Sequence, residues 1–208
     1  MGIGVHNAPR SLDAKLEIRK NVLEFVEPAR VFDGFCGPVG EMWSRAWRAA
    51  DDYVGCDQEW ILSDQRKRFV GDVRDVLRAV DLQRWNVFDF DAFGSPWDAM
   101  VILAERRRWS PGEIGAVVIT DGASMKSKFG QLPKSVANLI GRAEIASGQD
   151  NAFSAHDDAM RAWMRRCCLV PAHSWRARGK PNRRGVQMMN YQAVVFRARC
   201  GRVQRSVE

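Results

Sequence analysis

A glycine-bearing loop with an acid at its start is the first segment whose residue types and spacing could do chemistry. The loop runs Asp33-Gly34-Phe35-Cys36-Gly37-Pro38-Val39-Gly40 and follows a short apolar run at residues 30–33. Its three glycines let the backbone turn tightly and approach a ligand without Cβ clashes. Their G-x-x-G-x-x-G spacing differs from the G-x-G-x-x-G of dinucleotide sites. Because Asp33 would repel a pyrophosphate, we expect this carboxylate to face an ammonium group instead.

Two further acids follow the next two apolar runs. Asp57 comes at the end of the second run, where a carboxylate can accept hydrogen bonds from both hydroxyls of a ribose. Asp72 comes at the end of the third run, where it could accept from an adenine amino group. The alternative is that these acids, with Asp33, only cap the helices that follow them.

The segment Asp89-Phe90-Asp91-Ala92-Phe93-Gly94-Ser95-Pro96-Trp97 is the candidate reaction centre. An exocyclic amine is a poor nucleophile because its lone pair is shared with the ring. A carboxylate such as Asp91 can accept its N–H hydrogen bond and remove the proton that is released. Phe93 and Trp97 could then stack on either side of a planar base. The alternative is that both aromatic residues belong to the core below a structural turn.

The elements that must position these segments alternate between strand and helix. Apolar runs predict strands at 30–33, 52–57, 68–72, 85–91 and 116–121. Helical spacing predicts helices at 11–26 with Ser11 as the cap, at 41–50, from about 59, at 75–79 and at 98–108. In the first of these helices Arg19 takes a place in the apolar stripe. This alternation is typical of a parallel sheet covered by helices, which binds ligands at the carboxyl ends of its strands.

After Asp121 the alternation weakens. A short helix is predicted around 134–146, a second helix at 155–166, and two strands at 169–175 and 188–199 with the turn 179–185 between them. We therefore predict an α/β fold, with a single doubly wound, mostly parallel seven-stranded sheet, helices on both faces and a C-terminal antiparallel hairpin. All 208 residues form one domain in this prediction, divided into an N-terminal helix (1–27), a cofactor-binding core (28–121), an insertion or substrate region (122–160) and a basic C-terminal helix and hairpin (161–208).

With these segments in place, the chain resembles the class I, Rossmann-like methyltransferases that use S-adenosyl-L-methionine. The loop 31–40 resembles their first motif, in the D-x-F-C-G-x-G-G form of several nucleic-acid methyltransferases, with Val39 in place of a glycine. The segment 89–96 resembles the D-x-D-P-F-G-S/T-P motif of tRNA guanine-N2 methyltransferases, with Ala92 in place of the proline. The resemblance implies catalytic roles for Asp91, Phe93 and Trp97. The cofactor-binding residues that it implies are Asp33, Gly34, Phe35, Cys36, Gly37, Gly40, Asp57, Gln58, Asp72, Val73 and Asp89.

The charge of the chain favours a polyanionic partner. The net charge is +7 and the sequence pI is about 9.5, with many of the arginines in the last quarter. The alternative is a solvated basic surface with no partner. The residues that we expect to bind substrate are Ser95, Pro96, Lys126, Lys128, Arg178, Arg183 and Arg184.

Several other classes of protein are disfavoured. The five cysteines lack framework spacing, so we expect free thiols; a zinc site at Cys167, Cys168, His173 and Cys200 lacks the usual Cys-x2-4-Cys spacing, and we predict no metal. Carbon-5 cytosine methylation needs a cysteine at the loop 89–97, which has none. No Gly-x-Ser-x-Gly elbow supports a hydrolase. The sequence has neither a secretory signal nor a membrane span, so we expect a cytoplasmic protein.

The main hypothesis is an N-methyltransferase that acts on an exocyclic amine of a base in tRNA, other RNA or DNA. Two alternatives stay open: a methyltransferase for a small molecule or a protein, and a catalytically silent subunit that keeps the fold for binding. The sequence leaves the modified base, the polymer and the oligomeric state open.

Overall fold

The computed structural model describes residues 9–59, 66–92, 94–122, 129–178 and 189–199. Seven strands form one sheet: β1 (Arg30–Asp33), β2 (Asp52–Asp57), β3 (Arg68–Val70), β4 (Val87–Asp91), β5 (Ile114–Asp121), β6 (Leu169–Arg178) and β7 (Asn190–Ala198). The described α-helices are α1 (Pro9–Phe25), α2 (Glu41–Arg45), α3 (Val73–Ala79), α4 (Trp97–Arg106), α6 (Lys134–Ile140) and α7 (Gln149–Arg166). Short 3-10 turns follow α2 at Trp47–Ala49 and precede β4 at Leu82–Arg84.

The order of the strands across the sheet is β3-β2-β1-β4-β5-β7-β6. Strands β1 to β5 pair in parallel, whereas β7 runs antiparallel to both of its neighbours. The order reverses between β1 and β4, so the carboxyl ends of these strands border the switch point at which open α/β sheets bind ligands.

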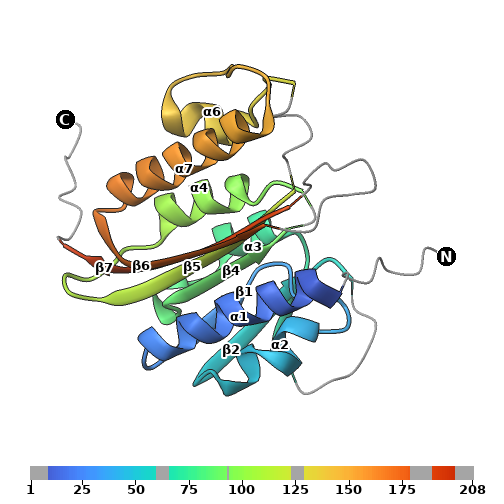
Figure 1. Ribbon diagram of the computed structural model, residues 1–208. Helices are drawn as coiled ribbons and strands as arrows, with labels where there is room; N and C mark the ends of the chain where they lie inside the picture. The colour runs from blue at the N-terminus through green and yellow to red at the C-terminus, as the bar shows by residue number, and fades with distance from the viewer. Residues whose placement is uncertain (1–8, 60–65, 93, 123–128, 179–188, 200–208) are drawn as a thin grey trace.

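Helices cover the sheet on both faces (Figure 1). Helices α1 and α2 lie below it in that view, and α3, α4, α6 and α7 lie above it. Each face has its own core: Val31, Val87 and Val118 point toward α1, while Phe32, Phe88 and Val117 point toward α3 and α4. The alternation follows from the pleat of a strand, which sends successive side chains to opposite faces.

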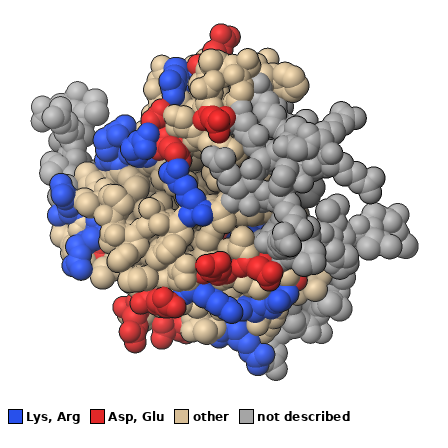
Figure 2. Space-filling model, viewed as in Figure 1, with Lys and Arg blue, Asp and Glu red and all other residues tan. Residues whose placement is uncertain are grey.

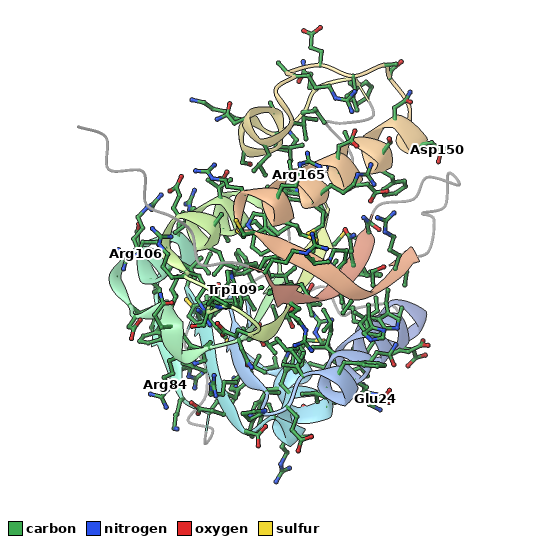
Figure 3. All side chains as sticks on the ribbon, turned by 90° about the vertical axis from the view of Figure 1, so that its left-hand side faces the viewer. Glu24, Arg84, Arg106, Trp109, Asp150 and Arg165 are labelled. Carbon is green, nitrogen blue, oxygen red and sulfur yellow. The ribbon has the colours of Figure 1, made fainter. Side chains whose placement is uncertain are left out.

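Trp109, just beyond α4, shows how tightly the second core is packed. It lies in the middle of the molecule in Figure 3, 5% exposed, with its ring edge-on to Phe196 of β7 and Phe88 of β4. Trp109 thus packs against strands β4 and β7 on the face of the sheet that α3 and α4 cover.

The predicted fold class is confirmed: a seven-stranded sheet, parallel apart from the C-terminal hairpin, with helices on both faces. Strands were predicted at all seven observed places. The helix predicted from about residue 59 falls on 60–65, outside the described residues, as does the turn 179–185.

Several helix boundaries differ from the prediction: α3 begins two residues earlier, α4 ends two residues earlier, and four further differences have a physical reason. Helix α1 begins at Pro9, so Ser11 does not cap it. Helix α7 begins at Gln149, and the prediction missed its first turn because that turn is polar and carries no apolar period. Helix α6 ends at Ile140, where Gly141 has a φ of 72°, a left-handed conformation that terminates helices. The helix predicted for 41–50 breaks at Ala46, with a φ of −130°, and the fully buried Trp47 follows the break.

Candidate active site

A cavity of about 370 Å³ opens at the carboxyl ends of β1, β2, β3 and β4. That volume lies within the usual range for small-molecule sites. Its walls combine apolar side chains with carboxylates and one arginine. They are Gly34, Phe35, Asp57, Gln58, Glu59, Gly71, Asp72, Val73, Arg74, Ala92, Gly94, Ser95, Asp98 and Ala99.

Gly34 is fixed at the floor of the cavity by its neighbours. Its N–H donates to the carbonyl of Asp89 at 2.7 Å, which ties the loop after β1 to β4. A Cβ at this position would come within 2.6 Å of Phe90 and 2.9 Å of Val73. Only glycine therefore lets the backbone pass between these side chains on its way to the cavity.

The rest of the glycine loop is held from β2 and from Arg66. The N–H of Gly37, which has a φ of 65°, donates to Asp57 Oδ2 at 3.0 Å. Arg66 donates to the carbonyls of Gly37 and Pro38, and a Cβ at Gly40 would overlap its guanidinium group. No sequence motif marks Arg66, which holds the loop through these two hydrogen bonds.

Asp57 and Asp72 both line the cavity, as predicted for cofactor-binding acids, and both also bind backbone. Asp57 Oδ1 accepts from the N–H of Glu59 at 3.1 Å. Asp72 caps α3 by accepting from the N–H of Arg74, whose guanidinium also contacts both of its oxygens. These hydrogen bonds lower the pKa of Asp72 to about 2, so the carboxylate stays ionised. Asp72 therefore caps α3 and lines the cavity at the same time.

Asp89 and Asp91 point away from Phe90, toward α1. Arg19 donates to both oxygens of Asp89, at 2.6 and 2.8 Å, and Trp47 Nε1 donates to Oδ2 at 2.7 Å. Lys15 Nζ lies 2.8 and 2.9 Å from the two oxygens of Asp91.

Two carboxylates and two cations thus form a buried cluster between β4 and α1. Burial opposes ionisation of Asp91, but the charges of Arg19 and Lys15 outweigh it and lower the pKa of that carboxyl. For Asp89 burial prevails over the charge of Arg19, and the pKa of its carboxyl is raised.

Asp33 belongs to the same face and is fully buried. Its Oδ2 accepts from the hydroxyl of Tyr53 at 2.9 Å, while Oδ1 has no hydrogen-bond partner among the described residues. Burial and the nearby charge of Asp89 raise the pKa of Asp33 well above its ordinary value. In this structure the carboxyl is closed off from the cavity, so a contact with an ammonium group would require the loop to move.

The buried Trp97 anchors the segment after β4 in the core. Trp97 is fully buried, and its Nε1 donates to Asp121 Oδ2 at 2.7 Å. His156 of α7 lies on the same carboxylate, with Nδ1 2.7 Å from Oδ2. A ring in this position offers no face to a base, so the structure places Trp97 in the core. Phe93 lies outside the described residues.

The predicted site residues thus divide into two groups. Gly34, Phe35, Gln58, Val73 and Ser95 line the cavity together with Asp57 and Asp72, whereas the buried Asp33, Cys36, Asp89 and Pro96 do not, nor do Gly37, Gly40 and Asp91. Cavity residues that sequence reasoning missed include Glu59, Arg74, Asp98 and Ala99. Lys15 and Arg19 were also missed, although a charged residue in the apolar stripe of a helix signals a buried partner.

The described surface carries no net basic excess. Nine Lys and Arg residues and two Asp and Glu residues have side chains outside the description, which accounts for the whole net charge of +7. On the face in Figure 2, basic and acidic side chains lie side by side, as do Arg176 with Asp157 and Arg161 with Asp158. The predicted substrate contacts Lys126, Lys128, Arg178, Arg183 and Arg184 all fall outside the described side chains.

Among the described residues no disulfide forms, and burial raises the pKa of Cys36 and of Cys56 to about 12. Within the described ranges no group of three His, Cys, Asp or Glu side chains could hold a metal ion. No described helix has the length and apolar character needed to cross a bilayer.

Several solved structures with a similar arrangement are methyltransferases. A SAM dependent methyltransferase from Archaeoglobus fulgidus aligns over 90% of this chain and 94% of its own, with a TM-score of 0.51 and 10% identity. The plantazolicin methyltransferase BpumL, in complex with a monoazolic desmethylPZN analog and SAH, aligns over 92% and 84%, with a TM-score of 0.52 and 12% identity. Geranyl diphosphate methyltransferase, in complex with GPP and sinefungin, aligns over 89% and 77%, with a TM-score of 0.50 and 15% identity. Neither a protein-family model nor a curated protein matches the sequence.

The sheet order and these similarities together define the class: the chain has the class I fold of S-adenosylmethionine-dependent methyltransferases.

Proposed function

We propose that the protein is an S-adenosylmethionine-dependent methyltransferase that binds its cofactor in the cavity at the carboxyl ends of β1–β4 and methylates a nitrogen held by Asp91. The observation that carries this proposal is the cavity itself. It joins the glycine loop, the acids at the ends of β2 and β3, and the segment after β4 at one switch point.

The chemistry of the cavity walls fits such a cofactor. Of the described residues, four carboxylates and one arginine line it, which suits a ligand with a positive sulfonium and an ammonium group. Phe35, Val73 and Ala99 offer apolar surface for a purine, with Asp72 beside them as an acceptor. Asp57 is placed at the end of β2, where a carboxylate can accept from ribose hydroxyls. When bound, the cofactor supplies an electrophilic methyl group.

The residues of the chain supply orientation and proton transfer. Gly34 and Arg66 hold the loop in place beside the cavity through close packing and hydrogen bonds. Asp91 accepts the N–H of the acceptor and receives the proton that nitrogen releases, which requires it to be ionised. Holding an acceptor and a cofactor in line lowers the barrier chiefly through entropy.

Two proposals remain for the molecule that accepts the methyl group. The D-x-D-A-F-G-S-P segment and the basic residues outside the described part favour an exocyclic amine of a nucleic-acid base, as in the tRNA guanine-N2 methyltransferases that the segment resembles. A small-molecule or peptide acceptor is favoured by the neutral described surface, by the buried Trp97 and by the plantazolicin and geranyl diphosphate methyltransferases among the structural neighbours.

One experiment addresses the cofactor and the acceptor together. Isothermal calorimetry with S-adenosylmethionine should show one site per chain. Incubation with labelled cofactor and separate pools of tRNA, total RNA, DNA and a metabolite extract, followed by mass spectrometry, should then show label in one pool. Cofactor binding without transfer to any pool would support the silent binding subunit instead, and no cofactor binding would refute the proposal.

A contact with nucleic acid can be tested on its own. Phosphate contacts make binding fall with salt, with a log–log slope of about −0.7 per contact for a single strand. Replacing Arg183 and Arg184 by Ala should flatten that slope and weaken binding to all sequences alike. An unchanged slope would move the small-molecule or peptide acceptor ahead.

A further inference from the structure

The pair Lys15–Asp91 lies at the carboxyl end of β4, on the face that α1 covers. Lys15 Nζ contacts both oxygens of Asp91, at 2.8 and 2.9 Å, and lies 5.6 Å from the ring centre of Tyr191 on β7. The two side chains are 6% and 11% exposed. Neither of them lines the cavity, but Ala92, the residue that follows Asp91 in the chain, does.

The charges next to the Lys15–Asp91 pair form a second ion pair, between Arg19 and Asp89. Arg19 gives its two strong hydrogen bonds to Asp89, and its Nη2 lies 3.4 Å from Asp91 Oδ2. Asp33 on β1 borders the group, and burial raises the pKa of its carboxyl well above the ordinary value. Around Asp91 and Asp89, the two cations Lys15 and Arg19 face two carboxylates. Lys15 is the cation whose nearest partner is Asp91.

We propose that Lys15 of α1 is a positioning residue of the reaction centre, which holds the Asp91 carboxylate ionised and in one orientation for the N–H of the acceptor. The inference rests on the proposed function, in which Asp91 binds the acceptor. A role in stability alone would not require this pair, because apolar side chains of similar volume often replace a buried ion pair without loss of stability.

The charge balance also bears on the class of acceptor. With Lys15 and Arg19 matching Asp91 and Asp89, the centre carries no net negative charge to attract a cationic amine. A neutral N–H acceptor, such as an aromatic amine or an amide-like nitrogen, is compatible with that balance. Its methylated form is a strong acid, so even a carboxylate of lowered pKa can receive its proton.

The test compares three variants of α1. Lys15→Met removes the charge and keeps the length of the side chain, Lys15→Arg keeps the charge, and Lys20→Met removes a charge from the exposed face of the same helix. Titration of ¹³Cγ-labelled aspartates by NMR, with Asp91 assigned through Asp91→Asn, reads the carboxylate directly. An opposite charge at this distance shifts a carboxyl pKa by about 1–3 units, so Lys15→Met should raise the Asp91 midpoint by about one unit. Lys15→Arg and Lys20→Met should leave it near that of the parent.

No displacement in Lys15→Met, or an equal one in Lys20→Met, would overturn the inference. If Lys15→Met does not fold by circular dichroism, Lys15→Gln carries the same expectation. In methyl transfer to the pool that the parent labels, the acid limb of the pH profile should shift upward with Lys15→Met, while cofactor affinity by calorimetry stays unchanged. A parent without any transfer would refute the proposed function, but the NMR titration would still decide the role of Lys15.

Discussion

Asp57→Ala should weaken cofactor binding by more than any effect on folding. In the structure the carboxylate lines the cavity while Oδ2 accepts from Gly37 and Oδ1 from Glu59. Losing a charge-assisted hydrogen bond to the ligand costs about 1.5–3 kcal/mol. Because every 1.4 kcal/mol changes Kd about tenfold, Kd should rise roughly 10- to 100-fold. Asp57→Asn keeps one acceptor oxygen for the N–H groups of the loop, so its affinity for the cofactor should fall less than that of Asp57→Ala.

The measurement is isothermal calorimetry with S-adenosylmethionine, with thermal unfolding of each variant alongside. Asp75→Ala is the matched control, since this acid lies on α3 outside the cavity wall and pairs only at the surface with Arg78. The control should bind like the parent. A Kd for Asp57→Ala within twofold of the parent value would show that the ribose is not placed at the end of β2.

Three further outcomes follow from the buried carboxylates. Asp91→Asn should keep cofactor affinity in calorimetry but lose most turnover, because an amide cannot take the proton; full activity would remove Asp91 from the mechanism. Arg19→Met should lower the free energy of unfolding by about 3–5 kcal/mol, since it leaves Asp89 buried without its cation; in urea titrations the deficit should shrink as the pH falls to about 3, below the ordinary aspartate pKa of about 3.9, because Asp89 is then protonated in both folded and unfolded states. Asp33→Asn should be at least as stable as the parent near pH 7, because the raised pKa of Asp33 means that its ionisation opposes folding once the pH exceeds the unfolded value; cofactor affinity lost in this variant would instead support a contact between Asp33 and the ammonium group.

The sheet could be predicted because its local patterns are strong. Short apolar runs that each end on an acid, such as 52–57 and 116–121, need no long-range information to be recognised as buried parallel strands. The positions of Gly34, Asp57 and Asp72 followed from the same patterns, because the carboxyl ends of parallel strands meet at one edge.

Helix ends were less predictable, since caps and tertiary contacts compete with periodicity. The break at Ala46 is an example: the sequence continues in helical spacing, yet Trp47 is buried with its indole N–H on Asp89, a residue 42 positions later. No local pattern contains that contact.

The direction of the charged side chains was decided by tertiary structure alone. Sequence spacing places Asp89 and Asp91 on the same face of a strand, but it does not say whether that face looks into the cavity or toward α1. The choice depends on which helix covers the face, and α1 brings Arg19 and Lys15 to it from about 70 residues away. The residue types and the strand ends were determined by the sequence; which acid lines the cavity and which pairs with a buried cation was determined by packing, because only packing sets the local dielectric and the partner of each charge.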